Sequence, residues 1–272
     1  MNTQVAVKEH EKLTLWNLAR GIWLALAAFI LVALVKAVPI YFEQAQQICT
    51  LGPAECAQST LMTVERLHQF EALGVSLTAW AAYTLITRLF LNAVFGLVAL
   101  IIFLRKPKER MPLFVAFFLL SFANNGVINA LGQSSAAWWL PVQLITASGW
   151  GSFLLFFTLF PSGHFAPRWM RWVVIVFVVL LFLGIFFPGS PLDVGNSLPW
   201  FPSIAFPAMF ASMLAAQVYR YRRVSTPVER QQTKWVVYGV AIMLILAIGF
   251  SLPMLFSSTY TQSTFIISCL AD

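Results

Sequence analysis

Residues Ile86 to Leu104 read ITRLFLNAVFGLVALIIFL, a run that is apolar apart from Thr87, Arg88 and Asn92. A bilayer core about 30 Å thick takes roughly 20 apolar helical residues to cross. Within lipid, a single segment satisfies all of its backbone polar groups only as a helix. The stretch therefore predicts a transmembrane helix.

The rest of the chain repeats this pattern. Of its 272 residues 60% are hydrophobic and 10% are charged, and the mean hydropathy is +0.80, which excludes a soluble domain with a charged surface. We predict an all-α polytopic membrane helix bundle, a single membrane domain over residues 1–272, with about seven transmembrane spans and a partial eighth over Phe265 to Leu270. The seven spans run over Gly21 to Ile40, Ile86 to Leu104, Pro112 to Leu131, Leu140 to Phe160, Trp172 to Phe187, Phe201 to Tyr219 and Trp235 to Leu255.

The basic residues are concentrated in alternate loops. They precede the first span, follow the second and fourth, and fill residues 220–234 between the sixth and seventh; the intervening loops are mostly acidic. Lysine and arginine accumulate on the cytoplasmic side of membrane proteins, so we expect a cytoplasmic N-terminus. This bias accounts for the net charge of +7 without an anionic partner, and we predict no nucleic-acid binding.

Residues 41–78 form the one sizeable loop on the predicted outer face. Cys49 and Cys56 flank a Gly-Pro turn signal, and an oxidising outer face favours a disulfide between them. A zinc site with His68 is the alternative, but it lacks a full set of four ligands. Leucine, valine and phenylalanine recur at helical spacing from Leu61 to Leu77, which predicts an amphipathic helix on the membrane surface.

The loop after the fourth span contains Pro161-Ser162-Gly163-His164, a tetrapeptide that also marks the active site of membrane lipid phosphatases. That chemistry needs a second histidine to protonate the leaving group and cations to hold the phosphate. No histidine follows His164, and the chain has no Arg-Pro pair. We therefore interpret Pro161 and Gly163 as the end of a helix.

Other membrane chemistries also lack their residues. The spans contain no paired histidines for haem and no mid-membrane carboxylate for proton coupling, and the chain has no His-Glu-x-x-His motif. We predict no catalytic residue, cofactor or metal site in this chain, and rank a lipid phosphatase below a small transporter or channel.

Polar side chains occur toward the predicted outer half of the bundle. They are Arg88, Asn92, Asn124, Asn125, Asn129 and Gln143, with Thr146 and Ser148 nearby. An amide facing lipid would lack partners, so each is expected to face another helix and to contribute about 1 kcal/mol of interhelical hydrogen bonding. The functional alternative is a ligand pocket in which Arg88 meets an anionic group.

Residues Arg220 to Trp235 read RYRRVSTPVERQQTKW and form a basic cytoplasmic hinge over residues 220–234. Thr226 and Glu229 have the spacing of a capping box, and Pro227 stands at the first helical position, so a helix is predicted to restart there. Arg222, Arg223, Glu229 and Arg230 are the candidate signalling residues of this hinge.

Four stretches together resemble the N-terminal membrane region of bacterial sensor histidine kinases with a layout like that of the competence-type peptide sensors. They are ICTLGPAECAQ, ALGVSLTAWAAYTL, LFPSGHFAPRWMRW and YRRVSTPVERQQTKWVVYG, which begin at Ile48, Ala72, Leu159 and Tyr221. In that family the fourth-span loop usually has an acidic or amide residue and an arginine where this chain has Ser162 and His164. The resemblance implies a multi-pass protein of the bacterial cytoplasmic membrane, with a further span and a kinase domain after this region.

We therefore expect a signal-sensing input module that has no catalytic activity of its own. Its partners would be the lipid bilayer and a kinase or other output domain, or a second copy of the chain. A small transporter or channel is the alternative function.

Overall fold

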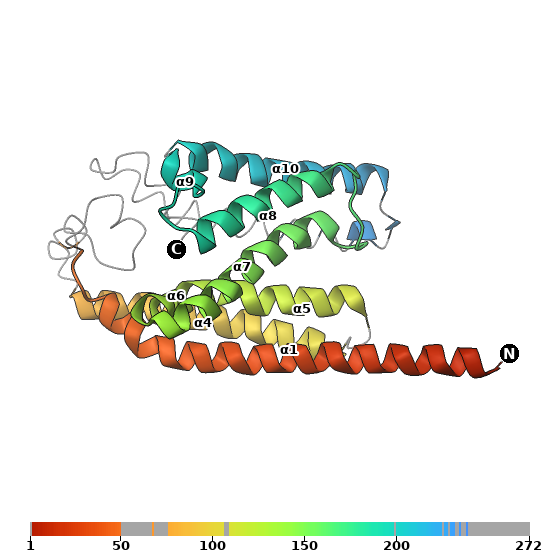
Figure 1. Ribbon diagram of the computed structural model, residues 1–272, viewed down its shortest axis with the longest axis horizontal. Coiled ribbons are helices and arrows are strands. Elements are labelled where there is room, and N and C mark those ends of the chain that lie inside the picture. Colours follow the sequence, from red (N-terminus) through yellow and green to blue (C-terminus); the bar gives the residue numbers. More distant parts are fainter. Residues whose placement is uncertain are drawn as a thin grey trace. The chain divides into compact units, whose positions relative to one another are not determined.

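The computed structural model describes residues 2–49, 76–105, 109–198 and 200–224, together with residues 67, 226, 227, 229–231, 234 and 238. The side chains of residues 2–15, Asn125, Asn196 and Ser203 are outside this description. The elements of the described part are all helices, which confirms the all-α class (Figure 1). They are α1 (Asn2–Gln44), α4 (Leu77–Arg105), α5 (Arg110–Ala123), α6 (Asn125–Ser134), α7 (Ala136–Leu159), α8 (Met170–Phe186), α9 (Val194–Ser197) and α10 (Phe201–Arg223).

Several helices are long and apolar enough to cross a membrane. Among the described residues three qualify: Trp16–Gln44 within α1, α4 and α7. A fourth is formed if α5 and α6, which are bent by 58° relative to each other, count as one broken span. Helices α8 and α10 lie at the predicted fifth and sixth spans, and α8 is an apolar helix of 17 residues. The predicted seventh span, the partial eighth and most of the amphipathic outer helix lie outside the described residues.

The contacts within the chain group its residues into two compact units, and the single membrane domain stays a prediction. Unit 1 comprises residues 1–48 and 60–149, and unit 2 comprises residues 49–59 and 150–272. The boundary falls inside α7, between Gly149 and Trp150. Helix α7 therefore contributes residues to both units.

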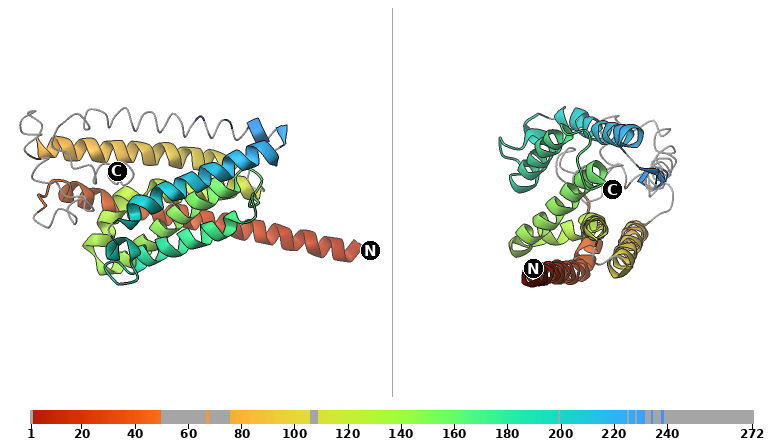
Figure 2. Two further views of the ribbon diagram at one scale, coloured as in Figure 1. Left: turned by 90° about the horizontal axis from the view of Figure 1, so that it is seen from above. Right: turned by 90° about the vertical axis from the view of Figure 1, so that its right-hand side faces the viewer.

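In unit 1, α4 lies alongside α5, and α1 packs against α6 (Figures 1 and 2). The buried face of α1 is a stripe of small residues at four-residue spacing, Ala33, Ala37 and Ala45, interrupted by Tyr41. In lipid, where apolar side chains gain little from leaving the solvent, helices associate through close van der Waals contact. Alanine at these positions lets the two backbones approach closely.

The third span, predicted over Pro112 to Leu131, is not one straight helix, because the helix breaks at Asn124. The Asn124 side-chain Nδ2 donates to the Leu120 carbonyl over 2.7 Å. Asparagine side chains compete in this way with the backbone ladder, and Gly126, two residues on, is a weak helix former. The Asn-Asn-Gly sequence thus ends α5 and starts α6 in a new direction.

In unit 2, α10 packs against α8 and α9. Leu154 of α7 and Met209 and Met213 of α10 form its buried core, surrounded by phenylalanines. Helix α7 ends at Leu159, and the Gly163 N–H, from a backbone with φ of +75°, donates to the Leu159 carbonyl over 2.8 Å. This confirms that Pro161 and Gly163 mark a helix end, since glycine adopts positive φ readily.

Candidate functional site

Arg88 lies farther inside its helix than the predicted span indicated. Helix α4 begins at Leu77, not near Ile86, so Arg88 lies about 16 Å from the helix start at 1.5 Å per residue. The helix is apolar and long enough to span a membrane. An ionisable side chain at such a position normally faces other helices or a water-filled cavity.

The half-buried Arg88 side chain reaches across to α1 and α6 within unit 1. Its guanidinium carbon lies 5.5 Å from the ring centroid of Tyr41, which is 3% exposed. A Cβ added to Gly126 would come within 2.1 Å of Arg88 Nη1. Gly126 therefore has a specific reason to be glycine: its bare backbone makes room for the guanidinium, and the aromatic ring stabilises the charge.

Two buried amides lie close in sequence to Arg88 and to Gly126. Asn92 is one turn further along α4 and is 7% exposed, and Asn124 at the α5–α6 break is 4% exposed. Among the described residues Asn92 Nδ2 lacks an acceptor and Asn124 Oδ1 lacks a donor. Unpaired buried polar atoms are uncommon in native proteins. A donor and an acceptor are thus available for a water molecule or a ligand.

Asn129 connects this region to α7. The Thr146 hydroxyl donates to Asn129 Oδ1 over 3.2 Å. We name Arg88, Asn92, Asn124, Asn129 and Thr146 the polar cluster. Gln143 is half-buried and forms no hydrogen bond within the described residues, and the Asn125 side chain lies outside them.

The other end of α7 is fastened by an arginine that the sequence analysis did not single out. Arg220 near the end of α10 is 1% exposed. Its guanidinium donates to the carbonyls of Thr158 and Phe160, and to that of His164 over 2.5 Å. The last carbonyls of a helix have no partner within the helix and carry a partial negative charge, so a cation here stabilises the end of α7.

Gln217, one turn before Arg220, takes part in the same arrangement. Its Nε2 donates to the Phe157 carbonyl and, over 3.4 Å, to that of Phe160. We name Gln217 and Arg220, with the carbonyls of Phe157, Thr158, Phe160 and His164, the carbonyl clamp. The clamp ties the first residue of the basic hinge to the end of α7 and its loop.

Burial lowers the pKa of the Arg220 guanidinium from its ordinary value, while the nearby Glu229 carboxylate acts in the opposite direction. Arginine remains protonated at neutral pH in either case. Arg220 therefore serves the clamp as a permanent cation.

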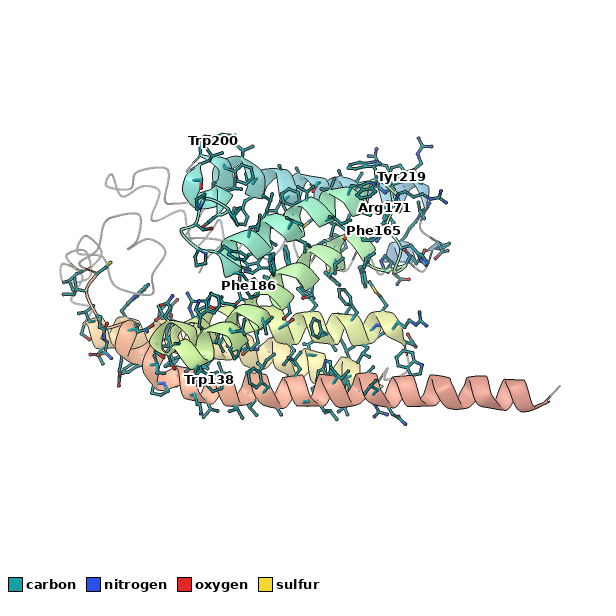
Figure 3. The ribbon with its side chains drawn as sticks, in the orientation of Figure 1. Trp138, Phe165, Arg171, Phe186, Trp200 and Tyr219 are labelled. Atoms are coloured by element: carbon teal, nitrogen blue, oxygen red, sulfur yellow. The ribbon has the colours of Figure 1, made fainter. Side chains whose placement is uncertain are left out.

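Beyond the clamp, the predicted capping box is confirmed. The backbone N–H and hydroxyl of Thr226 donate to Glu229 Oε2 over 2.8 and 3.0 Å, and the Glu229 N–H reaches Thr226 Oγ1 over 3.4 Å. The Arg230 guanidinium carbon lies 5.8 Å from the ring centroid of Tyr221. Arg222 and Arg223 are exposed. Figure 3 places Tyr219, Phe165 and Arg171 at one end of unit 2.

The His164 side chain is exposed, and its Nδ1 lies 2.8 Å from the Ser162 carbonyl oxygen. The His164 backbone carbonyl is the group that Arg220 uses. The Pro-Ser-Gly-His loop thus contributes a backbone carbonyl acceptor to the carbonyl clamp.

Cys49 is disulfide-bonded, but its predicted partner Cys56 lies outside the described residues, so the pairing stays a prediction. Within the described part of the chain no three histidine, cysteine or acidic side chains come together as metal ligands.

The sequence could have indicated part of the carbonyl clamp, which the sequence analysis did not predict. Gln217 and Arg220 are spaced by three residues at the end of an apolar helix, the spacing that places two side chains on one face. No local pattern shows which distant carbonyls they reach.

Comparison with protein-family models, with curated proteins and with solved structures finds no match to this chain.

Proposed function

We propose that the chain is the signal-sensing input module of a receptor in a bacterial cytoplasmic membrane. It would have about seven spans, a cytoplasmic N-terminus and no catalytic activity of its own. Its output would pass through the basic hinge to a kinase or other output domain, or to a second copy of the chain. The carbonyl clamp carries this proposal, because Arg220 fastens the hinge to the end of α7.

The polar cluster is the proposed input site. Its ligand would present an anionic group to Arg88 and hydrogen-bonding atoms to Asn92 and Asn124, whose free donor and acceptor support this assignment. A ligand shifts an equilibrium only through a difference in affinity between two arrangements. The Asn129–Thr146 hydrogen bond offers such a difference, since it would be kept in one arrangement of α6 and α7 and lost in another.

Helix α7 supplies the proposed route from input to output. It contributes Thr146 to the polar cluster and the Thr158 carbonyl to the clamp. Binding that rotates or shifts this helix would move the carbonyls that hold Arg220. The hinge follows directly, and its Thr226–Glu229 capping box begins the next helix six residues after Arg220.

A small transporter or channel is the second candidate, and the broken helix favours it. Discontinuous helices line the substrate sites of many transporters, and α5 and α6 are bent by 58° near Arg88. The two functions differ in one observable property, because a transporter moves solute without a partner. We expect proteoliposomes that contain the chain alone to keep imposed potassium and proton gradients as long as protein-free liposomes do.

Trypsin digestion of inside-out membrane vesicles tests the proposed output. Arg222 and Arg223 are exposed, whereas Arg220 is buried, so we expect cleavage after Arg222 or Arg223 in inside-out and not in right-side-out vesicles. Arg88→Ala should change the cleavage rate if the polar cluster is coupled to the hinge. Leu144→Ala, an exposed change on α7, is the matched control and should leave the rate unchanged. An unaltered rate in Arg88→Ala would speak against an input module.

A further inference from the structure

A second site lies in unit 1 away from the polar cluster, between α1 and α5. It is a groove with a volume of about 470 Å³. One wall is a face of α1 that includes Trp16, Ile22 and Trp23, and the other is a face of α5 that includes Arg110, Phe114 and Phe117. With Ala19 and Leu113, which also line the groove, the residues on each helix recur at the three- and four-residue spacing of a single face.

The groove has a polar end and an apolar end. Trp16 is the first residue of a candidate membrane span, and Arg110 is the first residue of α5, so these two residues stand where helices enter the apolar layer. Phe114 and Phe117 lie one and two turns deeper along α5. The positive-inside distribution predicts that the polar end faces the cytoplasm.

The polar end is arranged for an anion. Glu109, the N-cap residue of α5, makes no side-chain capping hydrogen bond, and the first turn contains no acidic residue. It contains Arg110 instead, which is exposed. A helix N-terminus carries a partial positive charge and unpaired N–H groups, so Arg110 and the helix end together attract an anion in addition to the neighbouring Glu109 carboxylate. Arg110 and the helix end would bind that anion together.

A second observation, on α1, also indicates an occupant that brings a hydrogen-bond acceptor. Trp23 is 5% exposed, and its Nε1 has no hydrogen-bond acceptor within the described residues. Its ring stacks on Phe103 at a centroid distance of 4.1 Å, and the Arg20 guanidinium carbon lies 5.7 Å from the same Phe103 ring. An occupant of the groove that brings an oxygen acceptor would meet this unsatisfied indole N–H.

We propose that this groove binds an anionic phospholipid of the cytoplasmic leaflet. The phosphate would lie at Arg110 and the α5 N-terminus, and an acyl chain would lie along Ile22, Phe114 and Phe117. Basic pockets between membrane helices on the cytoplasmic side select anionic headgroups, and tryptophan favours the membrane interface. A zwitterionic lipid would bring its own cation into this positively charged end of the groove. The site is independent of the proposed signalling function.

The test uses the purified full chain in a non-ionic detergent, titrated with dioctanoyl phosphatidylglycerol or dioctanoyl phosphatidylcholine, with bound lipids counted by native mass spectrometry. The first lipid should bind at least roughly tenfold more tightly when it is phosphatidylglycerol, because phosphatidylcholine brings its choline cation close to Arg110 and the positive end of α5, whereas the glycerol headgroup brings no positive charge. Arg110→Ala should remove most of this preference, and Arg110→Lys should restore part of it. Trp23→Phe, which keeps the stacked ring, should weaken both lipids.

Arg168→Ala is the matched control, because Arg168 is also exposed and lies in a predicted cytoplasmic loop. It should leave the preference unchanged. Equal binding of the two lipids, or an equal loss in Arg168→Ala and Arg110→Ala, would overturn the proposal. So would the absence of any bound lipid, which would indicate that another part of the chain or a second copy fills the groove.

Discussion

Arg88 in unit 1 and Arg220 in unit 2 are arginines on apolar helices, and their surroundings differ. Arg220 is 1% exposed and reaches three carbonyls at the end of another helix. Arg88 is half-buried and reaches an aromatic ring and the backbone of a glycine. A helix end offers carbonyls without partners, whereas the carbonyls of a helix interior are already used. The end of α7 thus gives Arg220 a set of carbonyl acceptors that the middle of a helix does not offer.

Removing Arg220 should have the largest effect. Arg220→Ala removes the cationic donor of three carbonyls, of which only that of Phe160 keeps Gln217 as a donor. Charge-assisted hydrogen bonds contribute more than neutral ones, so we expect a loss of about 3 kcal/mol in the free energy of unfolding. Thermal unfolding in nanodiscs would measure it. Arg220→Lys should recover part of the loss, and Arg222→Ala, an exposed change in the same turn, should stay within about 0.5 kcal/mol of wild type. Equal losses at both positions would show that the clamp does not stabilise unit 2.

A smaller effect is expected at Gly126. Gly126→Ala would put a methyl group within 2.1 Å of Arg88 Nη1. The flexible side chain can move away, so the cost is the lost packing over Tyr41, about 1–2 kcal/mol. A double-mutant cycle measures it: in an Arg88→Ala background the same substitution should cost close to nothing. Additive costs would mean that the two residues are not in contact in the membrane.

The capping box should contribute less to overall stability and act locally. Glu229→Ala removes the acceptor for the Thr226 N–H and hydroxyl, and losing a cap costs about 1 kcal/mol. Amide hydrogen exchange at Thr226 and Arg230 should become faster while the rest of unit 2 is unchanged. Glu229→Gln keeps an acceptor and should remain close to wild type. Unchanged exchange in Glu229→Ala would argue against a helix start at this position.

Asn92 should have the smallest effect on stability. Its Nδ2 is buried without an acceptor among the described residues, so Asn92→Leu removes an unsatisfied donor at similar volume and should change the unfolding free energy by less than about 0.5 kcal/mol. Asn124→Leu is the comparison, because it removes the hydrogen bond to the Leu120 carbonyl and should cost more. A large loss in Asn92→Leu would identify Asn92 as interhelical support, not a candidate ligand-binding residue.

Local patterns predicted the local structure of this chain. Composition predicted the all-α class, Pro161 and Gly163 the end of α7, and Thr226 with Glu229 the capping box. Hydropathy did not detect the break at Asn124, because the helices on both sides are mostly apolar. An average over many residues does not respond to one asparagine side chain that competes for backbone hydrogen bonds. The clamp could not be predicted, since the carbonyls that hold Arg220 lie about 60 residues earlier in the chain and carry no sequence information.

Sequence patterns also could not predict which residues the polar side chains contact. Arg88 of α4 and Gly126 of α6 come together because α4, which packs along α5, also contacts α6. Which helix face each residue occupies depends on packing that the apolar spans do not encode strongly, since lipid and protein neighbours are equally apolar.

The central claim is that the polar cluster and the basic hinge are coupled. Hydrogen–deuterium exchange of the full chain in nanodiscs tests it directly, with wild type, Arg88→Ala and Arg220→Ala compared at the amides of residues 220–231. We predict that both variants change hinge exchange and that Leu144→Ala does not. If Arg220→Ala alters the hinge while Arg88→Ala leaves it identical to wild type, the clamp only stabilises unit 2, and the input-module account is contradicted.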